Sequence, residues 1–261
     1  MDTTWNHHFV HANGIRVHYV RHGAGFPLIL LHGWPGFWYV WRKNILPLAE
    51  HFDVIVPDQR GFGDTDKPDV PAVGGYDKQV RAEDLRGMAD ALGLERFGIV
   101  THDIGSWVAQ VFALRYPERV PRMVLFDMAY PGIGDRWRAP DHIKEIWYTY
   151  FHQQPWAAQL VGASRDSVRT YFRHFLGHWA HDGHTFDEDL EIWVDTYMKP
   201  GNLQGGFNWY VAVDAERTAM MRGEAPRQPV IDTPTRILWG ASDKVLKVAW
   251  ADRLGPSAVP R

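Results

Sequence analysis

The chain of 261 residues contains no cysteine, and this absence removes several chemistries at the outset. A disulfide framework, a thiolate nucleophile and thiolate metal sites are all excluded. No apolar stretch is long enough to cross a membrane, and the polar, histidine-containing amino terminus does not have the pattern of a signal peptide. We therefore expect a cytoplasmic protein that does not act at a membrane.

A strong excess of charge of one sign is also missing. The 28 Lys and Arg residues nearly balance 31 Asp and Glu, for a formal net charge of -3. Such a chain has no field that would attract nucleic acid or an anionic membrane. Its 45% hydrophobic content, with 14% aromatic residues, suffices for one large core. A small molecule is the expected partner, and the sequence is compatible with a homodimer.

Short apolar runs alternate with amphipathic ones along most of the chain. Residues 28–31, 54–56, 123–126 and 236–239 are continuously apolar or nearly so, as strands buried on both faces are, whereas residues 15–20 alternate like a half-exposed strand. Residues 80–94 and 106–115 have helical spacing, and a further short helix is predicted at 248–254. The pattern predicts an α/β fold with a mostly parallel sheet flanked by helices.

The alternation stops between about residues 135 and 227. This stretch is rich in aromatic residues and helix-like segments, at 141–152, 165–179 and 187–199, and contains no convincing buried strand. It is predicted to be a helical cap over the carboxyl ends of the strands, where open α/β sheets bind ligands. The predicted division is a core of residues 1–134 and 228–261 and a cap of residues 135–227. Most of the cap's aromatic residues are expected to pack its own core.

The most informative residue is Asp103. It follows the apolar run at 97–100, precedes the helical stretch from Ser106, and has Gly105 close by, which is the pattern of a nucleophile elbow. An ionised carboxylate at this apex can attack an sp3 carbon without a base and form an ester. This points to epoxide or carbon–halogen chemistry, although an aspartate here could also be a simple helix N-cap.

Three other motifs follow predicted strands in the same way. They are His-Gly-Trp-Pro at 32–35, a glycine-rich acidic loop at 58–66 that is expected to be structural, and Trp-Gly-Ala-Ser-Asp at 239–243. Together with the elbow, this ordered set resembles the α/β-hydrolase superfamily, and the Asp apex resembles its epoxide hydrolase branch. The resemblance covers essentially the whole chain and implies the α/β-hydrolase fold.

The resemblance also implies the site residues. Asp103 would be the nucleophile, and the backbone amides of Trp34 and Ile104 would form the oxyanion hole, with no metal or other cofactor. The acid that orients the catalytic base would be Asp243, which follows the strand after the cap, or Asp127, which lies one strand after the nucleophile. We favour Asp243, because branches that use the earlier position often lack an acid at the later one.

Two cap tyrosines match the phenols that assist ring opening in epoxide hydrolases. Tyr148 lies in an aromatic segment that ends in Gln-Pro, with Tyr150 as the alternative register, and Tyr210 belongs to an Asn-Trp-Tyr motif. Packing is the alternative role for each of them. Haloalkane dehalogenases usually carry Trp directly after the nucleophile, where this chain has Ile104. Fluoroacetate dehalogenases carry two elbow arginines, which Ile104 and Trp107 replace.

The base histidine that the family carries after its last strand has no counterpart here. No histidine follows His184, and the family's last strand and terminal helix are not recognisable either, so we expect a truncated chain. The sequence therefore predicts an epoxide hydrolase that opens a small apolar epoxide, with water as the second reactant. A dehalogenase is the alternative enzyme, and a non-catalytic ligand-binding or sensor protein is the alternative from another class.

Overall fold

A seven-stranded sheet organises the chain. The computed structural model describes residues 5–224 and 229–254. The strands are β1 (His7–Ala12), β2 (Ile15–His22), β3 (Phe26–Leu31), β4 (Phe52–Pro57), β5 (Gly98–His102), β6 (Met123–Phe126) and β7 (Thr235–Leu238), in the spatial order β1-β2-β4-β3-β5-β6-β7. The five strands from β4 to β7 run parallel, and β1 and β2 are antiparallel to their neighbours. The mostly parallel α/β sheet is therefore as predicted.

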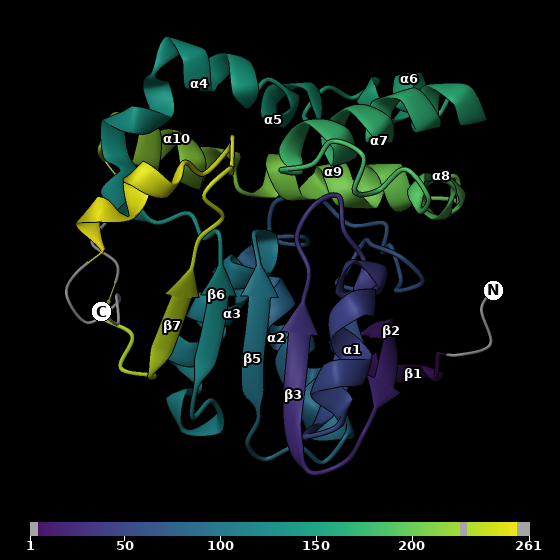
Figure 1. Cartoon of the computed structure of the whole chain (residues 1–261), viewed down its shortest axis with the longest axis vertical. Coiled ribbons are helices and arrows are strands. Elements are labelled where there is room, and N and C mark those ends of the chain that lie inside the picture. The colour runs from purple at the N-terminus through teal and green to yellow at the C-terminus, as the bar shows by residue number, and fades with distance from the viewer. Residues whose placement is uncertain (1–4, 225–228, 255–261) are drawn as a thin grey trace.

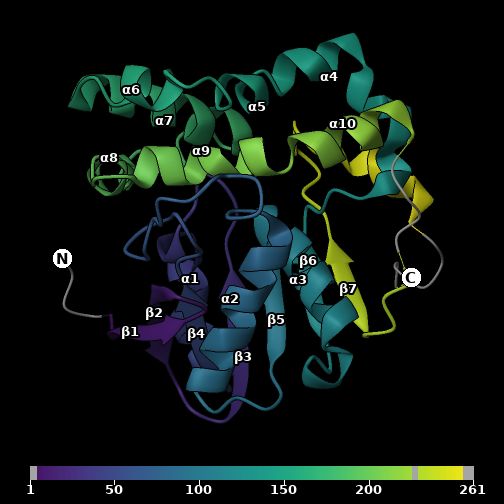
Figure 2. The same cartoon turned by 180° about the vertical axis from the view of Figure 1, so that it is seen from behind.

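Helices cover both faces and the upper edge of this sheet. The α-helices are α1 (Arg42–Ala49), α2 (Lys78–Ala91), α3 (Ile104–Arg115), α4 (Pro140–Glu145), α5 (Tyr148–Phe151), α6 (Ala157–Val161), α7 (Arg165–Trp179), α8 (Leu190–Tyr197), α9 (Asn202–Ala212) and α10 (Asp214–Arg222). The 3-10 helices are η1 (Trp38–Trp41), η2 (Pro117–Arg119), η3 (Pro131–Arg138) and η4 (Val248–Arg253). Helix α1 lies on one face of the sheet and α2 and α3 lie on the other (Figures 1 and 2).

The helices α4 to α10 form a separate layer, called the helical layer below. It lies across the ends to which the parallel strands point (Figure 1). No helix in the described residues is long and apolar enough to cross a membrane. The predicted cap boundary at residue 227 and the predicted core residues 255–261 lie outside the described residues.

Local sequence signals explain where several elements begin. The Asp77 side chain accepts hydrogen bonds from the backbone of Gln79 and Val80, which caps α2 at its amino end. Asn13 and Gly14, both with positive φ, form the two-residue turn between β1 and β2. Asn-Gly is the strongest short hairpin signal, so β1, which sequence reasoning missed, could have been found from it.

Two predicted helices differ from the structure. The segment at 141–152 is divided into α4 and α5, because the backbone of Ile146 leaves helical geometry with ψ of 19° while its side chain is buried. The segment at 248–254 is the 3-10 helix η4 instead of an α-helix. The carbonyl of Trp250 accepts a hydrogen bond from the Tyr130 hydroxyl, which holds this turn against η3.

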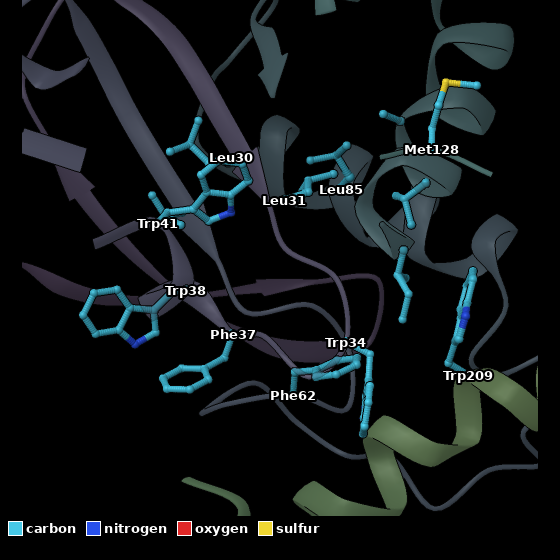
Figure 3. Packing of buried hydrophobic residues seen from close by; sticks show 14 of the residues in the cluster. Leu30, Leu31, Trp34, Phe37, Trp38, Trp41, Phe62, Leu85, Met128 and Trp209 are labelled. Carbon is cyan, nitrogen blue, oxygen red and sulfur yellow. The ribbon is translucent and has the colours of Figure 1, made fainter. Parts of the chain in front are cut away.

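The helical layer meets the loops of the sheet at very close range. A Cβ atom on Gly205 of α9 would lie 2.3 Å from the carbonyl oxygen of Gly61, which itself has a positive φ of 85°. Beside this contact, a Cβ on Gly206 would lie 3.4 Å from the Trp34 ring and 3.5 Å from Phe62. Figure 3 shows Trp34 next to the helical layer, with Phe62 beside it. Only glycine allows α9 to approach the sheet this closely.

Candidate active site

Asp103 occupies a sharp turn between β5 and α3. Its φ of 51° and ψ of -116° are unusual for a residue other than glycine. The turn is possible because its surroundings are small. A Cβ on Gly105 would lie 2.7 Å from the carbonyl oxygen of Leu31, and a Cβ on Gly33 would lie 2.4 Å from Cβ of Asp103. The strand, strained apex and helix have the geometry of a nucleophile elbow.

Two backbone N–H groups face the Asp103 carboxylate. The amide of Trp34 donates a hydrogen bond of 3.0 Å to Oδ2, and the amide of Ile104 is the second donor. Burial raises the pKa of Asp103, whereas nearby His102 and these two donors act in the opposite direction. The amides that sequence reasoning paired as an oxyanion hole therefore lie beside the carboxylate.

Tyr148 of α5 and Tyr210 of α9 come together above the elbow. Their rings are 5.7 Å apart and nearly perpendicular, and Trp34 stacks on Tyr148 at 5.5 Å. Burial raises the pKa of both phenols well above 10, and the negative charge of Asp103 adds to the effect. Both hydroxyls are therefore protonated at neutral pH. Tyr150, the alternative register, is 42% exposed, and its hydroxyl faces Met221 Sδ. Tyr148 lines a cavity beside Asp103, and Tyr150 is not among its lining residues.

A cavity of about 680 Å³, including open space, joins these groups. Its wall contains Asp103, Tyr148 and Tyr210, and most of the remainder is apolar, from Trp107, Ala129, Trp137, Ile146, Trp209, Val213, Met220, Val245 and Leu246. A second hollow, of about 1570 Å³ including open space, shares Asp103 and Tyr148 and extends towards β7. The cavities lie where the helical layer covers the sheet, as expected for a ligand site in this architecture.

The two candidate acids, Asp127 and Asp243, both line the larger hollow. Asp127 follows β6, accepts a hydrogen bond of 2.6 Å from the Gly240 amide, and lies 3.9 Å from Nε2 of His102. Oδ1 of Asp243 accepts hydrogen bonds from the amides of Val245 and Leu246. Burial, with a contribution from Asp127, raises the pKa of Asp243 to about 6. The structure thus places both acids near the elbow, each with a different set of partners.

The histidines nearest these acids make no hydrogen bond to either of them within the described residues. His102 and His181 line the larger hollow, and His181 is hydrogen-bonded to Ser242. His152 is buried among the aromatic rings and pairs with the hydroxyl of Tyr171 at 2.6 Å. Burial lowers the pKa of His152 well below 6.5.

Sequence reasoning missed two charged residues of the smaller cavity, Glu216 and Arg217. Arg217 of α10 lines its wall together with Asp103 and the two tyrosines. The amphipathic sequence around Arg217 does not indicate that this side chain lines a cavity, because its place there depends on how α10 packs over the sheet. Within the described part of the chain, no group of three or more His, Asp or Glu side chains could hold a metal ion.

Comparison with known proteins agrees with this arrangement. Residues 27–253 match the α/β-hydrolase fold family. A soluble epoxide hydrolase from Corynebacterium sp. (strain C12) is 37% identical over 97% of this chain and 87% of its own length. Epoxide hydrolase 4 of Homo sapiens is 29% identical over 92% of this chain, which spans 66% of that protein.

A solved structure is similar as well. The epoxide hydrolase CorEH without ligand superposes with a TM-score of 0.78 and 31% sequence identity, over 91% of this chain and 83% of that one. The family match, over residues 27–253, includes the elbow, the helical layer and both candidate acids. The chain therefore belongs to the α/β-hydrolase superfamily, in its epoxide hydrolase branch.

Proposed function

We propose that the protein opens a small, mostly apolar epoxide to a diol through an ester on Asp103. One observation carries the proposal: the Asp103 carboxylate and two protonated phenols line the same apolar cavity. A carboxylate nucleophile opposite two hydrogen-bond donors suits a three-membered ring, whose oxygen gains charge as its carbon is attacked. The similarity to proteins named epoxide hydrolase supports the same reaction.

The first step joins the substrate to the protein. An oxygen of Asp103 attacks a ring carbon, the bond from that carbon to the epoxide oxygen breaks, and Tyr148 or Tyr210 donates a proton to the departing oxygen. The product is a hydroxyalkyl ester of Asp103. Because the attacking group is already ionised, this step needs no base.

The second step returns the free enzyme. Water attacks the carbonyl carbon of the ester, and the amides of Trp34 and Ile104 stabilise the oxyanion that forms. Collapse of this intermediate breaks the ester C–O bond, and the departing alkoxide takes up the proton that the base removed from the water. The second proton of the water returns to the tyrosinate, which restores the Asp103 carboxylate and the phenol and releases the diol. The attacking water must lose a proton to a base, and we propose that Asp243 or Asp127 orients that base, with Asp243 favoured.

We also propose that residues 135–227 form a cap domain on a core of residues 1–134 and 228–261. The cap would contribute the two phenols and the core would contribute the nucleophile, so that ring opening requires both. Support comes from the position of α5 and α9 across the ends of the strands (Figure 2).

The test is a panel of terminal and aryl epoxides with matched chloro- and bromoalkanes, scored for diol and for halide. We expect faster reaction with the epoxides, because the phenols can protonate an alkoxide whereas Ile104 offers no indole N–H to a leaving halide. Halide release that exceeds diol formation across the panel would make the protein a dehalogenase. Binding without any covalent product would favour a sensor.

A further inference from the structure

The smaller cavity contains a guanidinium group whose hydrogen-bonding capacity is not used. Arg217 lines this cavity together with Asp103, Tyr148 and Tyr210. Its Nε and Nη2 atoms are buried, and neither has a hydrogen-bond partner among the residues that the structure describes. Burying N–H donors without an acceptor is unfavourable in free energy, and the penalty is largest for a charged group.

The nearby carboxylates are already engaged. Glu216, the neighbour of Arg217 in the chain, also lines the cavity but forms an ion pair with Lys78. Asp214, one turn earlier, accepts a hydrogen bond of 2.8 Å from Gln153. The Arg217 guanidinium lies 5.1 Å from the centre of the Tyr150 ring, which holds the group in place without accepting its N–H bonds.

The charge of Arg217 acts on the reacting groups of the cavity. Burial is the main reason that the pKa values of Tyr148 and Tyr210 are raised, and the positive charge of Arg217 opposes that rise at both phenols. The other charged groups on the wall are Asp103 and the paired Glu216. A negative group on a ligand would therefore be repelled at the elbow and attracted at α10.

We propose that Arg217 binds a carboxylate of the substrate, so that the preferred epoxide has an apolar body and an acid group directed to α10. This inference rests on the proposed function and narrows its substrate class. The planar guanidinium presents parallel N–H donors that match the two oxygens of a carboxylate. The apolar wall between α10 and the elbow suits an aryl or alkyl body.

The first experiment compares 4-(oxiran-2-yl)benzoate with 4-(oxiran-2-yl)benzamide, which differ in charge at one end only. The rate of Asp103 labelling in the first turnover is followed by intact-mass measurement. We expect the parent to prefer the acid, and the ratio of the two rates to fall about 10- to 100-fold in Arg217→Gln, the loss typical of a charge-assisted hydrogen bond. Arg217→Lys keeps the charge without the planar group and should give an intermediate ratio.

Arg222→Gln is the matched control. It removes the same charge from the same helix at an exposed position, and it should leave the ratio of the two rates as in the parent. A parent that prefers the amide, or an Arg217→Gln ratio equal to that of the parent, would overturn the inference. If Arg217→Gln does not fold, the ratio of the two rates in Arg217→Lys tests the inference instead. A ratio equal to that of the parent would then overturn the inference.

A second experiment separates this inference from the epoxide chemistry. Calorimetric titration with 3-phenylpropanoate and 3-phenylpropanamide measures carboxylate binding without any reaction. Tighter binding of the acid that is lost in Arg217→Gln, in a protein that opens no epoxide, would contradict the proposed function and support the carboxylate site. Epoxide opening together with equal binding of the acid and the amide would support the proposed function and contradict the carboxylate site.

Discussion

The backbone amide of Trp34 donates a 3.0 Å hydrogen bond to Oδ2 of Asp103, so the loop after β3 and the turn after β5 meet at one oxygen atom. The carboxylate is thereby restrained at the wall of the cavity. In the reaction that we propose, the same donor would stabilise negative charge once Asp103 has become an ester. Both proposed steps, attack on the epoxide and hydrolysis of the ester, would then depend on this one turn.

Asp103→Asn should abolish covalent capture of an epoxide and leave the fold intact, because the amide keeps the shape and loses the nucleophilic charge. Intact-mass measurement after incubation with an aryl epoxide checks this. Since burial raises the pKa of Asp103, capture by the parent should also decline on acidification at a higher pH than an ordinary aspartate would require. An adduct on the variant equal to that on the parent would rule out Asp103 as the nucleophile.

Gly33→Ala should slow capture by about tenfold or more, because the new methyl group would lie 2.5 Å from Oδ2 of Asp103 and displace it. The rate of adduct formation is the measurement. Gly183→Ala serves as the control, since its nearest contact would be an ordinary 3.5 Å. Equal rates in the two variants would mean that Asp103 tolerates displacement.

Tyr210→Phe should slow ring opening by roughly ten- to a thousandfold, the range expected for the loss of one positioned acid. Tyr148→Phe should have an effect of the same kind. Tyr150→Phe is the control, because that hydroxyl faces Met221 and the side chain is 42% exposed. Epoxide consumption in the first turnover gives the rates, and a larger loss in Tyr150→Phe than in Tyr148→Phe would support the alternative register.

The 261-residue chain should form the Asp103 ester faster than it hydrolyses it, giving at most a stoichiometric burst. The reason is that no histidine in the described residues is hydrogen-bonded to Asp127 or Asp243. The mass of the protein, followed over time, reports the persistence of the ester. Steady turnover would require a base, and His102→Gln and His181→Gln would then show which of the two histidines on the larger hollow supplies it.

Asp243→Asn should increase stability relative to the parent more at pH 7.5 than at pH 4.5. The folded-state pKa of about 6 is above the ordinary 3.8, so the folded protein binds this proton more tightly, and stability decreases as pH rises through 6. Ionisation of Asp243 lowers the free energy of unfolding by on the order of 1–3 kcal/mol. Urea unfolding at both pH values measures the difference.

The exposed Asp69 provides the control, as Asp69→Asn, for a general effect of removing one carboxylate. Asparagine at position 243 keeps an oxygen for the amides of Val245 and Leu246, so the turn should survive the change. Parallel stability curves for Asp243→Asn and the parent would show that the carboxyl group does not couple to folding.

Sequence patterns were sufficient to predict the sheet and the turn geometry of the elbow. The central strands are recognisable because continuous apolar runs such as 54–56 are buried on both faces, and Asp103 is recognisable because a small-residue turn must follow its strand. The predicted helix at 165–179 coincides with α7, which begins with a Ser164 capping box. Residues that are neighbours in the sequence determine these features, so the sequence alone is enough to predict them.

Contacts between distant segments could not be predicted in the same way. Arg60 and Asp84 form a buried ion pair across 24 residues, and Arg217 reaches the cavity only through the packing of α10. The choice between Asp243 and Asp127 stays a prediction for a related reason, since both follow strands that lie side by side in the sheet. Spacing in the sequence does not distinguish two acids at the same edge.

The contact between Gly61 and Gly205 limits how this fold can be recombined. Because a single methyl group at either position would separate α9 from the loop after β4, a helical layer transplanted from a relative would need glycine at the point that meets residue 61. A misfit there would lift α9, and Tyr210 with it, away from Asp103. Chimaeras designed to change substrate preference should therefore retain this pair of glycines and vary the far end of the layer, at α10.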